Sequence, residues 1–254
     1  MKLIVNADDF GYSKGVNHGI VDSFKDGIVT ATTLLTTMPG SQHAYELAKE
    51  HPTLDIGIHL TIDLGRPTLG AEKVPGLIQG NGEFHTYEHW TSATSVPTNE
   101  IYAEWKNQLE TAIENGIKPS HIDSHHHLHM LPLVFPIYTQ LAHEYGLGVR
   151  FHPCWGWTAA ETAAAEDSLK ELKRADYFSS DFYEEKVAVN FFESLPMIDE
   201  TWEIMCHPAY LDPELLKRTS YLNERITEVE VLNSDETKAE IERLGIELIS
   251  FKDL

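Results

Sequence analysis

This sequence has few cysteines and no long apolar run. Its only cysteines are Cys154 and Cys206, and two cysteines so far apart do not form the disulfide framework of a small secreted domain. No stretch approaches the roughly 18 apolar residues of a membrane-spanning helix. The opening residues, MKLIVNADDFG, are too short an apolar run for a secretory leader, because two aspartates follow at once. We therefore expect a cytoplasmic protein with no membrane partner.

Basic residues are also scarce. Lys and Arg number 19 against 40 Asp and Glu, which gives a formal net charge of −21 at pH 7. A surface this acidic repels phosphate backbones, so we exclude nucleic acid as a partner. Hydrophobic residues make up 42% of the 254 residues, which is enough for a sizeable core, and this length is typical of a single α/β domain.

Strand-like and helix-like patterns alternate along the whole chain. Short runs rich in β-branched or aromatic residues predict strands at 2–7, 28–37, 54–62, 121–126, 147–152, 176–180, 201–207 and 246–251. Apolar periodicity and capping residues predict helices at 15–27, 41–52, 98–116, 133–146, 166–175 and 234–245. This alternation predicts parallel strands with helical crossovers, in an open α/β sheet or a barrel.

One long connection interrupts this alternation. Residues 63–97 are rich in Gly, Pro and Thr and show little periodicity. A connection of this length inside a compact domain is usually functional. We therefore expect it to form a lid or a wall of a substrate site.

Acidic and imidazole side chains follow five of the predicted strands at the point where each strand ends. The carboxyl ends of parallel strands meet at one edge of an α/β sheet, and active sites form there. Taken singly, His59 is more typical of a buried core histidine, and His152 and His207, each before a proline, are typical of an extended strand end. Together these residues predict one polar site: Asp8, Asp9, His59, Asp123, His125, His127, His152 and His207.

The stretch HIDSHHHLHMLP (121–132) holds five histidines within nine positions. Alternate residues of a strand share a face, so Asp123, His125 and His127 would point the same way if the strand persists. One histidine from this stretch, His59 and one of the two adjacent aspartates make a ligand set that leaves water positions open, as a catalytic metal requires. Such a set suits zinc or cobalt, and the other aspartate is then free to act as a base.

Five motifs occur in an order that identifies a family: NADDFG, IGIHLT, HIDSHHHLHMLP, RFHP and MCHPAY. In this order they resemble the YdjC-like carbohydrate deacetylases, which include chitooligosaccharide deacetylases. The resemblance runs from residue 4 to about residue 210. It implies one deacetylase domain over residues 1–254, folded as a distorted (β/α) barrel with fewer than eight regular strands and a layout like that of the NodB-type deacetylases. It also implies one divalent metal ion, which is magnesium in descriptions of the family.

The resemblance further implies a role for each matching position. Asp9, His59 and His125 would be the metal ligands, with His127 as the alternative to His125. Asp8 would be the general base and His207 the acid. Residues expected to orient the ligands or to contact the substrate are Asp123, His127, Arg150, His152 and Tyr210. Aromatic residues that could stack on a sugar, or else pack in the core, are Trp90, Trp155, Trp157 and Tyr210.

The activity implied is removal of the N-acetyl group from an amino sugar, such as a short chitooligosaccharide or its 6-phosphate, with release of acetate. Two other interpretations stay open. A metal-dependent phosphoesterase or glycosidase would use similar ligands, although phosphate chemistry favours cationic clamps and only Arg150 lies near one of these strand ends. A non-catalytic sugar sensor would be expected to lack the base or the acid, and both Asp8 and His207 are present. The sequence is also compatible with a homodimer.

Overall fold

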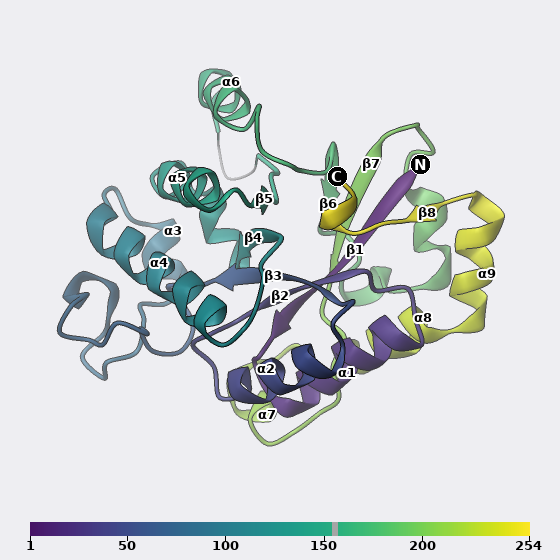
Figure 1. Cartoon of the computed structure of the whole chain (residues 1–254), viewed down its shortest axis with the longest axis horizontal. Coiled ribbons are helices and arrows are strands. Elements are labelled where there is room, and N and C mark those ends of the chain that lie inside the picture. The colour runs from purple at the N-terminus through teal and green to yellow at the C-terminus, as the bar shows by residue number, and fades with distance from the viewer. Residues whose placement is uncertain (154–156) are drawn as a thin grey trace.

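A computed structural model describes residues 1–153 and 157–254 of the chain. Its centre is one sheet in which every pair of neighbouring strands runs parallel, in the order β5-β4-β3-β2-β1-β7-β6, with β8 also paired to β1 (Figure 1). The strands are β1 (Lys2–Phe10), β2 (Ala31–Leu34), β3 (Asp55–Leu60), β4 (His121–Ser124), β5 (Gly148–Val149), β6 (Tyr177–Ser179), β7 (Thr201–Cys206) and β8 (Glu247–Leu248).

The sheet curves into a barrel that is not closed by regular strands. Within the described residues β5 and β6, at the two ends of the strand order, do not pair with each other, and β5 and β8 have only two residues each. The predicted α/β class and the distorted (β/α) barrel are therefore confirmed. No helix of the described ranges is long and apolar enough to cross a membrane.

Helices connect the strands and cover the outside of the sheet. Helices α1, α2 and α8 lie side by side along one flank, and α4 and α5 pack together on another (Figure 1). The helices are α1 (Lys14–Lys25), α2 (Ser41–Glu50), α3 (Tyr87–Thr91), α4 (Thr98–Glu114), α5 (Phe135–Tyr145), α6 (Ala159–Ser168), α7 (Leu215–Arg218), α8 (Asn223–Asn233) and α9 (Asp235–Leu244).

Local signals explain where several helices begin and end. The Ser13 side chain accepts a hydrogen bond from the Val16 amide at the start of α1, and Ser234 caps α9 in the same way. The prediction of a helix at 166–175 was wrong in its bounds, because Thr158 and Glu161 form a capping box that starts α6 earlier. Helix α8 was not predicted, since its buried face includes two charged residues, Arg225 and Glu228.

Two strands end differently from the prediction, and both differences shape the polar site. Strand β1 continues through Asp8 and Asp9, which were expected in a loop, and its register with β2 shifts between Ala7 and Phe10. Strand β4 stops at Ser124, so the expected alternation through His127 was wrong. A 3₁₀ segment (His125–Met130) follows, in which His126 and His127 have left-handed backbone angles, with φ of 49° and 54°.

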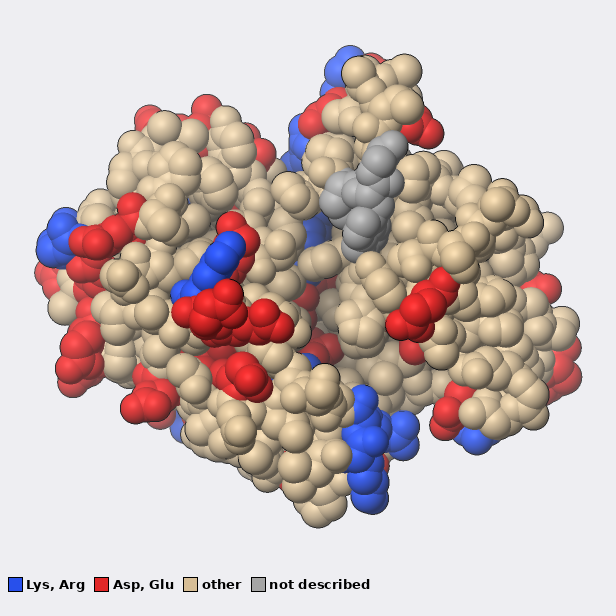
Figure 2. Space-filling model, turned by 180° about the vertical axis from the view of Figure 1, so that it is seen from behind, with Lys and Arg blue, Asp and Glu red and all other residues tan. Residues whose placement is uncertain are grey.

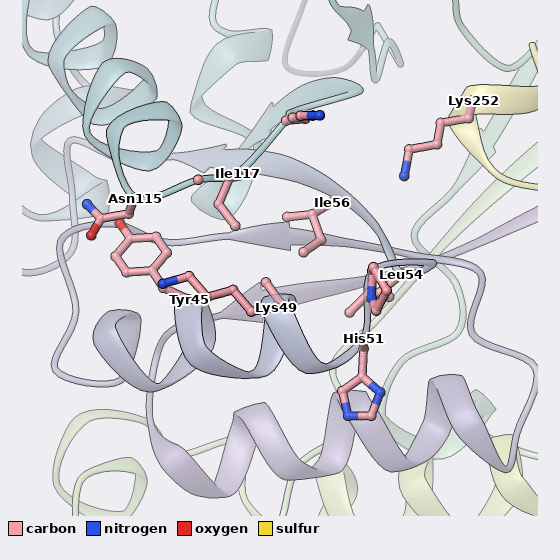
Figure 3. A pocket seen from close by; sticks show the side chains of 12 residues that line it. Tyr45, Lys49, His51, Leu54, Ile56, Asn115, Ile117 and Lys252 are labelled. Carbon is pink, nitrogen blue, oxygen red and sulfur yellow. The ribbon is translucent and has the colours of Figure 1, made fainter.

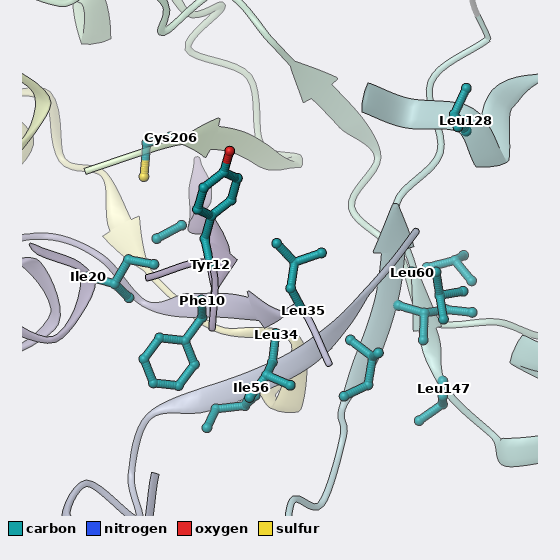
Figure 4. Close-up of a cluster of buried hydrophobic side chains, with 14 of the residues drawn as sticks. Phe10, Tyr12, Ile20, Leu34, Leu35, Ile56, Leu60, Leu128, Leu147 and Cys206 are labelled. Atoms are coloured by element: carbon teal, nitrogen blue, oxygen red, sulfur yellow. The ribbon is translucent and has the colours of Figure 1, made fainter. Parts of the chain in front are cut away.

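A continuous hydrophobic core fills the space between the sheet and the helices. Figure 4 shows part of it, with Phe10, Leu34 and Leu60 from three neighbouring strands among the buried side chains. The segment after β7 comes very close to α1, because a Cβ atom on Gly19 would lie only 2.5 Å from the Ala209 Cα atom. This close contact fixes the chain immediately after His207 against the core.

The surface has the acidic character that the composition predicts. Acidic side chains are spread over the face in Figure 2, which is hollowed near its centre. Most basic side chains that form ion pairs do so at exposed positions, whereas Arg150 and Arg225 are buried. These two arginines lie beside the polar site.

Candidate active site

The carboxyl ends of β1, β3, β4 and β7 surround one cavity of about 500 Å³. Parallel pairing brings these ends together, with His59 of β3 in register with Asp123 of β4 and Ala7 of β1 in register with Cys206 of β7. The predicted site residues that line this cavity are Asp8, Asp9, His59, His125, His127 and His207. Four separate segments of the chain thus deliver carboxylates or imidazoles to one place.

Asp9 and His59 leave two metal-binding atoms facing each other. The His59 Nδ1–H donates to Asp123 Oδ1 at 2.6 Å, which directs Nε2 towards Asp9. Burial would lower the pKa of His59, but Asp123 and the nearby Asp8 and Asp9 raise it to about 9, so a cation bound at Nε2 would replace a proton. That Nε2 atom lies 3.8 Å from Asp9 Oδ1, a buried oxygen with no hydrogen-bond partner among the described residues. A buried carboxylate oxygen without a donor is unfavourable, so a cation between these two atoms fits the arrangement.

His125 is oriented in the same manner by a residue that sequence analysis missed. Its Nδ1–H donates to Asp63 Oδ1 at 3.0 Å, which leaves its Nε2 free, and its ring lies edge-on to that of His59 with centroids 5.9 Å apart. Burial alone would raise the pKa of Asp63, but His125 and His126 hold that pKa well below its ordinary value. Asp63 follows the third strand by three residues, the same signal that singled out the other acids.

Two groups of three potential ligands have atoms that all lie within 4.8 Å of one another, and the set Asp9, His59 and His125 is not one of them. The two groups are Asp63 with His125 and His126, and Asp8 with His59 and Asp123. In both groups the carboxylates already accept hydrogen bonds from the histidines or from Arg150. By contrast, Asp9, His59 and His125 each keep one potential metal-binding atom that makes no hydrogen bond among the described residues. In Asp9 this atom is Oδ1, because Oδ2 already accepts from Arg225. The chemistry of this set therefore suits a divalent metal ion.

Asp8 is surrounded by hydrogen-bond donors. Its two oxygens accept from the two terminal nitrogens of Arg150, both at 2.8 Å, and Oδ1 also accepts from Asn6 at 2.8 Å. Burial would raise the pKa of Asp8, but the Arg150 charge holds it far below its usual range. Arg150 itself is buried and also binds Asp123 at 2.8 Å and Glu203 at 2.7 Å, so it orients carboxylates and does not line this cavity.

Helix α8 supplies a second buried arginine beside the site, which sequence analysis also missed. The Arg225 side chain donates to Asp9 Oδ2 at 2.8 Å. One turn later, Glu228 accepts from the backbone N–H of His207 and from the Tyr221 hydroxyl. The buried positions of α8, including Arg225, Glu228 and Leu232, follow helical spacing. The signal was therefore present, but charges occupied places where apolar residues are expected.

His207 follows β7 and also lines the cavity. Its Nδ1 atom is buried and has no partner among the described residues, and the rings of Tyr183 and Tyr221 face it edge-on. Burial, reinforced by the Arg225 charge, lowers the pKa of His207 to about 4, although Asp9 and Asp8 lie nearby. The ring is therefore neutral at pH 7 and accepts a proton only when a reacting group supplies it.

His127 and His152 lie around a smaller cavity of about 180 Å³, next to the main one. His127 lines both cavities, and burial together with the Arg150 charge lowers its pKa to about 3. His152 is exposed and lines only the smaller cavity. His152 therefore does not join the other strand-end residues in the main cavity, because β5 ends early, at Val149. Its role towards the ligands or the substrate stays a prediction.

Three of the aromatic residues predicted to meet a sugar, Trp90, Trp157 and Tyr210, do not line the main cavity. Tyr210 is on the α1 side, where its hydroxyl donates to Asp22, and it does not line the cavity. Trp90 is buried and donates to the Ile62 carbonyl, and Trp157 donates to the Met130 carbonyl while packing on Phe135. Trp155 lies outside the described residues. The aromatic side chains that do line the cavity are Tyr12, Tyr87, Tyr183 and Tyr221.

Fold and site together define a distorted (β/α) barrel with carboxylates and imidazoles at the carboxyl ends of its strands, in an arrangement compatible with a divalent metal ion. Residues 2–243 match the sequence model of the family described as YdjC-like protein. The chain is 44% identical over its whole length to a protein of the same extent from Brevibacillus brevis, named carbohydrate deacetylase. A protein of that name from Geobacillus stearothermophilus is 41% identical, covering 98% of this chain and 96% of its own. The chain therefore belongs to the YdjC-like family.

Solved structures agree with this assignment. A crystal structure from Enterococcus faecalis, of a protein provisionally named for cellobiose-phosphate cleavage, superposes with a TM-score of 0.90 at 34% identity, over 99% of this chain and 98% of that one. The lactam utilization protein of Thermus thermophilus shares the fold, with a TM-score of 0.51 at 16% identity over 98% of this chain and all of the other. These comparisons confirm the family and the barrel predicted from the motifs.

Proposed function

We propose that this protein is a metal-dependent carbohydrate deacetylase that removes the N-acetyl group from an amino sugar and releases acetate. The observation that supports this most directly is the facing pair of potential ligand atoms, Asp9 Oδ1 and His59 Nε2, which lie 3.8 Å apart in a buried site. Asp9 Oδ1 has no hydrogen-bond partner among the described residues. The names of relatives up to 44% identical over the full length support the same activity. The bond broken is the C–N bond of the acetamide, with water as the other reactant.

Asp9, His59 and His125 would hold the metal ion. When bound, a divalent ion lowers the pKa of water towards neutrality and polarises a carbonyl group. Asp123 and Asp63 orient the two imidazoles, and Arg225 holds the other oxygen of Asp9. Two histidines and one carboxylate suit zinc or cobalt, whereas the family resemblance favours magnesium. Elemental analysis of protein purified without chelator distinguishes these ions.

Asp8 would act as the general base. It is ionised at neutral pH, because Arg150 keeps its pKa low, and its Oδ2 accepts only one hydrogen bond in the side-chain network, so it retains a lone pair for a water proton. Arg150 fixes the carboxylate plane through two parallel hydrogen bonds. His207, which also lines the cavity and is neutral before the reaction, would pass to the departing amine the proton that Asp8 has taken from water. Without this proton the C–N bond breaks slowly.

The substrate we propose is a short chitooligosaccharide or its 6-phosphate. The rings of Tyr183 and Tyr221 are stacked, with centroids 4.2 Å apart, and both line the cavity, so they offer an aromatic surface for a sugar. Arg218 also lines the cavity and makes only a long contact of 3.6 Å with Glu214. An arginine in this position would suit a sugar phosphate.

An acetate-release assay over N-acetylglucosamine, chitobiose and their 6-phosphates tests both the activity and the substrate class. Acetate release from at least one of them is expected. Release of phosphate instead of acetate would favour a metal-dependent phosphoesterase, and release of free sugar units would favour a glycosidase. Binding of chitobiose without any product would favour the non-catalytic sensor. A cytoplasmic location and a homodimer remain predictions from the sequence.

A further inference from the structure

A second cavity, of about 340 Å³, lies at the opposite edge of the sheet from the candidate active site. It is formed by the last turns of α2, the segment that leads into β3, the turn between α4 and β4, and the 3₁₀ segment Phe251–Asp253 (Figure 3). These elements meet where β3 and β4 begin, whereas the metal-ligand set lies where those strands end. We call this space the basic cavity, after Lys49, Lys118 and Lys252, which line it.

The charge of the basic cavity is opposite to that of the whole chain. The protein has a net charge of −21 and only 19 basic residues, yet three lysines gather here and no acidic residue is among the described residues that line the space. The side chains of Lys49 and Lys118 form no ion pair or hydrogen bond within the described chain. Lys252 contacts the buried Asp55 at 3.2 Å. The basic cavity is therefore a local positive region on an acidic protein.

A buried hydroxyl group adds a further donor. Tyr45 is 4% exposed and lines the basic cavity, and within the described residues its hydroxyl has no hydrogen-bond partner. Burial raises the pKa of Tyr45 to about 12, so this group stays protonated. A buried polar group without a partner lowers stability, and a ligand oxygen would supply the missing partner. Figure 3 shows Tyr45 and Lys49 extending from the same helix, with Lys252 across the space.

The rest of the lining is apolar. Leu54, Ile56 and Ile117 are buried, with exposed fractions of 3%, 6% and 5%, and they form a hydrophobic surface beside the lysines. A bare inorganic ion would leave this surface unused. A ligand with an anionic group rich in acceptor oxygens and an attached organic part matches both halves of the lining.

We propose that the basic cavity binds a small organic phosphate monoester, with Lys49, Lys118 and the Tyr45 hydroxyl around the phosphate and the organic part against Ile117. This site is separate from the candidate active site, and it does not depend on the deacetylase activity. The two ammonium groups can only donate hydrogen bonds, and the tyrosine hydroxyl can donate one. A phosphate dianion offers several acceptor oxygens to these three groups.

Isothermal titration calorimetry tests this proposal. The full chain, loaded with metal, is titrated with glucosamine 6-phosphate and, for comparison, with inorganic phosphate and with glucosamine. Glucosamine 6-phosphate is expected to bind more tightly than inorganic phosphate, and glucosamine without phosphate is expected not to bind here. Lys49→Ala combined with Lys118→Ala should weaken binding of the sugar phosphate by about tenfold or more. Lys25→Ala is the matched control and should have no effect on binding. Lys25 is an exposed lysine in the last turn of α1, just as Lys49 lies in the last turn of α2.

Two further variants separate this site from its alternatives. Tyr45→Phe should weaken binding without lowering the melting temperature, because the hydroxyl has no partner to lose in the free protein. Arg218→Ala, at the candidate active site, should leave this binding unchanged. If Arg218→Ala abolishes binding and the lysine variants do not, the sugar phosphate occupies the active-site cavity and the proposal is overturned. Equal binding by wild type and by the double lysine variant would overturn it as well.

Discussion

The two sides of the candidate active site treat adjacent carboxylates in opposite ways. On the β5 side, Arg150 binds both oxygens of Asp8. On the α8 side, Arg225 binds one oxygen of Asp9 and leaves the other without a partner. The left-handed backbone of Asp9, with φ of 74°, turns the two neighbouring side chains apart. The two adjacent aspartates thus have different hydrogen-bond partners, and we base on this difference the proposal that Asp9 is the metal ligand and Asp8 the base.

The largest effect should come from removing an atom of the ligand set. His59→Ala deletes the Nε2 atom that faces Asp9 Oδ1, and we expect loss of bound metal and of all measurable turnover. Metal content by elemental analysis and acetate release by a coupled assay check this together. His18→Ala, an exposed histidine on α1, is the matched control. A His59→Ala protein with a full metal complement would exclude His59 as a ligand.

Because the two aspartates have different hydrogen-bond partners, we expect Asp8→Asn and Asp9→Asn to lose activity in different ways. Asp8→Asn keeps the shape but removes the base, so kcat should fall by about 10²–10⁴-fold while bound metal is retained. Asp9→Asn should lose metal as well as turnover. If metal content instead follows Asp8, the roles of the two neighbours are exchanged.

A smaller effect is expected from the residue that orients His125. Asp63→Asn weakens the acceptor for His125 Nδ1–H, and metal affinity should fall by about 10–100-fold. Competition with a chelator of known affinity measures this without reference to turnover. Asp199→Asn, at an exposed loop position, should not change affinity. An unchanged affinity in Asp63→Asn would mean that His125 is held by its backbone turn alone.

The smallest effect concerns the pH dependence of stability on the α8 side. Burial raises the pKa of Glu228 from 4.5 to about 7. In the unfolded chain this group loses its proton near pH 4.5, whereas in the folded chain it keeps the proton to about pH 7. Its contribution to stability is therefore present at low pH and is lost as pH rises through that window.

Glu228→Gln should remove this loss of stability at higher pH, because glutamine does not ionise. Urea unfolding at pH 5 and at pH 8 measures how far the free energy of unfolding falls between these two pH values. This decrease should be smaller in the variant than in wild type by on the order of 2 kcal/mol. Parallel pH profiles for the two proteins would show that Glu228 is ionised in the folded protein throughout the range.

Sequence analysis placed the strand-end residues well because one rule applies to all of them. In a parallel sheet every carboxyl end lies at the same edge, so Asp9, His59, His125 and His207 could be grouped without knowing any contact. His152 lies outside this group because β5 ends after two residues. His127 lines the cavity as predicted, but it does so from a left-handed turn and not from a continued strand, and nothing in the histidine-rich stretch indicates such a turn.

The residues that were missed act through contacts between distant segments. Arg225 is 216 residues from Asp9 along the chain, and no local pattern relates the two. Asp63 was adjacent to a recognised strand, but it lay at the start of a segment treated as a loop. Tyr183 and Tyr221 became neighbours only through the packing of α8 and the 3₁₀ segments. Long-range pairing of charges and rings is a property of the folded chain, and sequence spacing does not reveal it.

The uneven pairing of the sheet has a consequence for how the protein opens. Strand β1, which carries both aspartates, is paired with β2, β7 and β8, whereas β5 pairs only with β4 in the described chain. Backbone amides of β5 should exchange with deuterium through local fluctuations, and those of β1 only when the whole barrel unfolds. The barrel edge near β5 can therefore open and reclose while the two aspartates keep their positions.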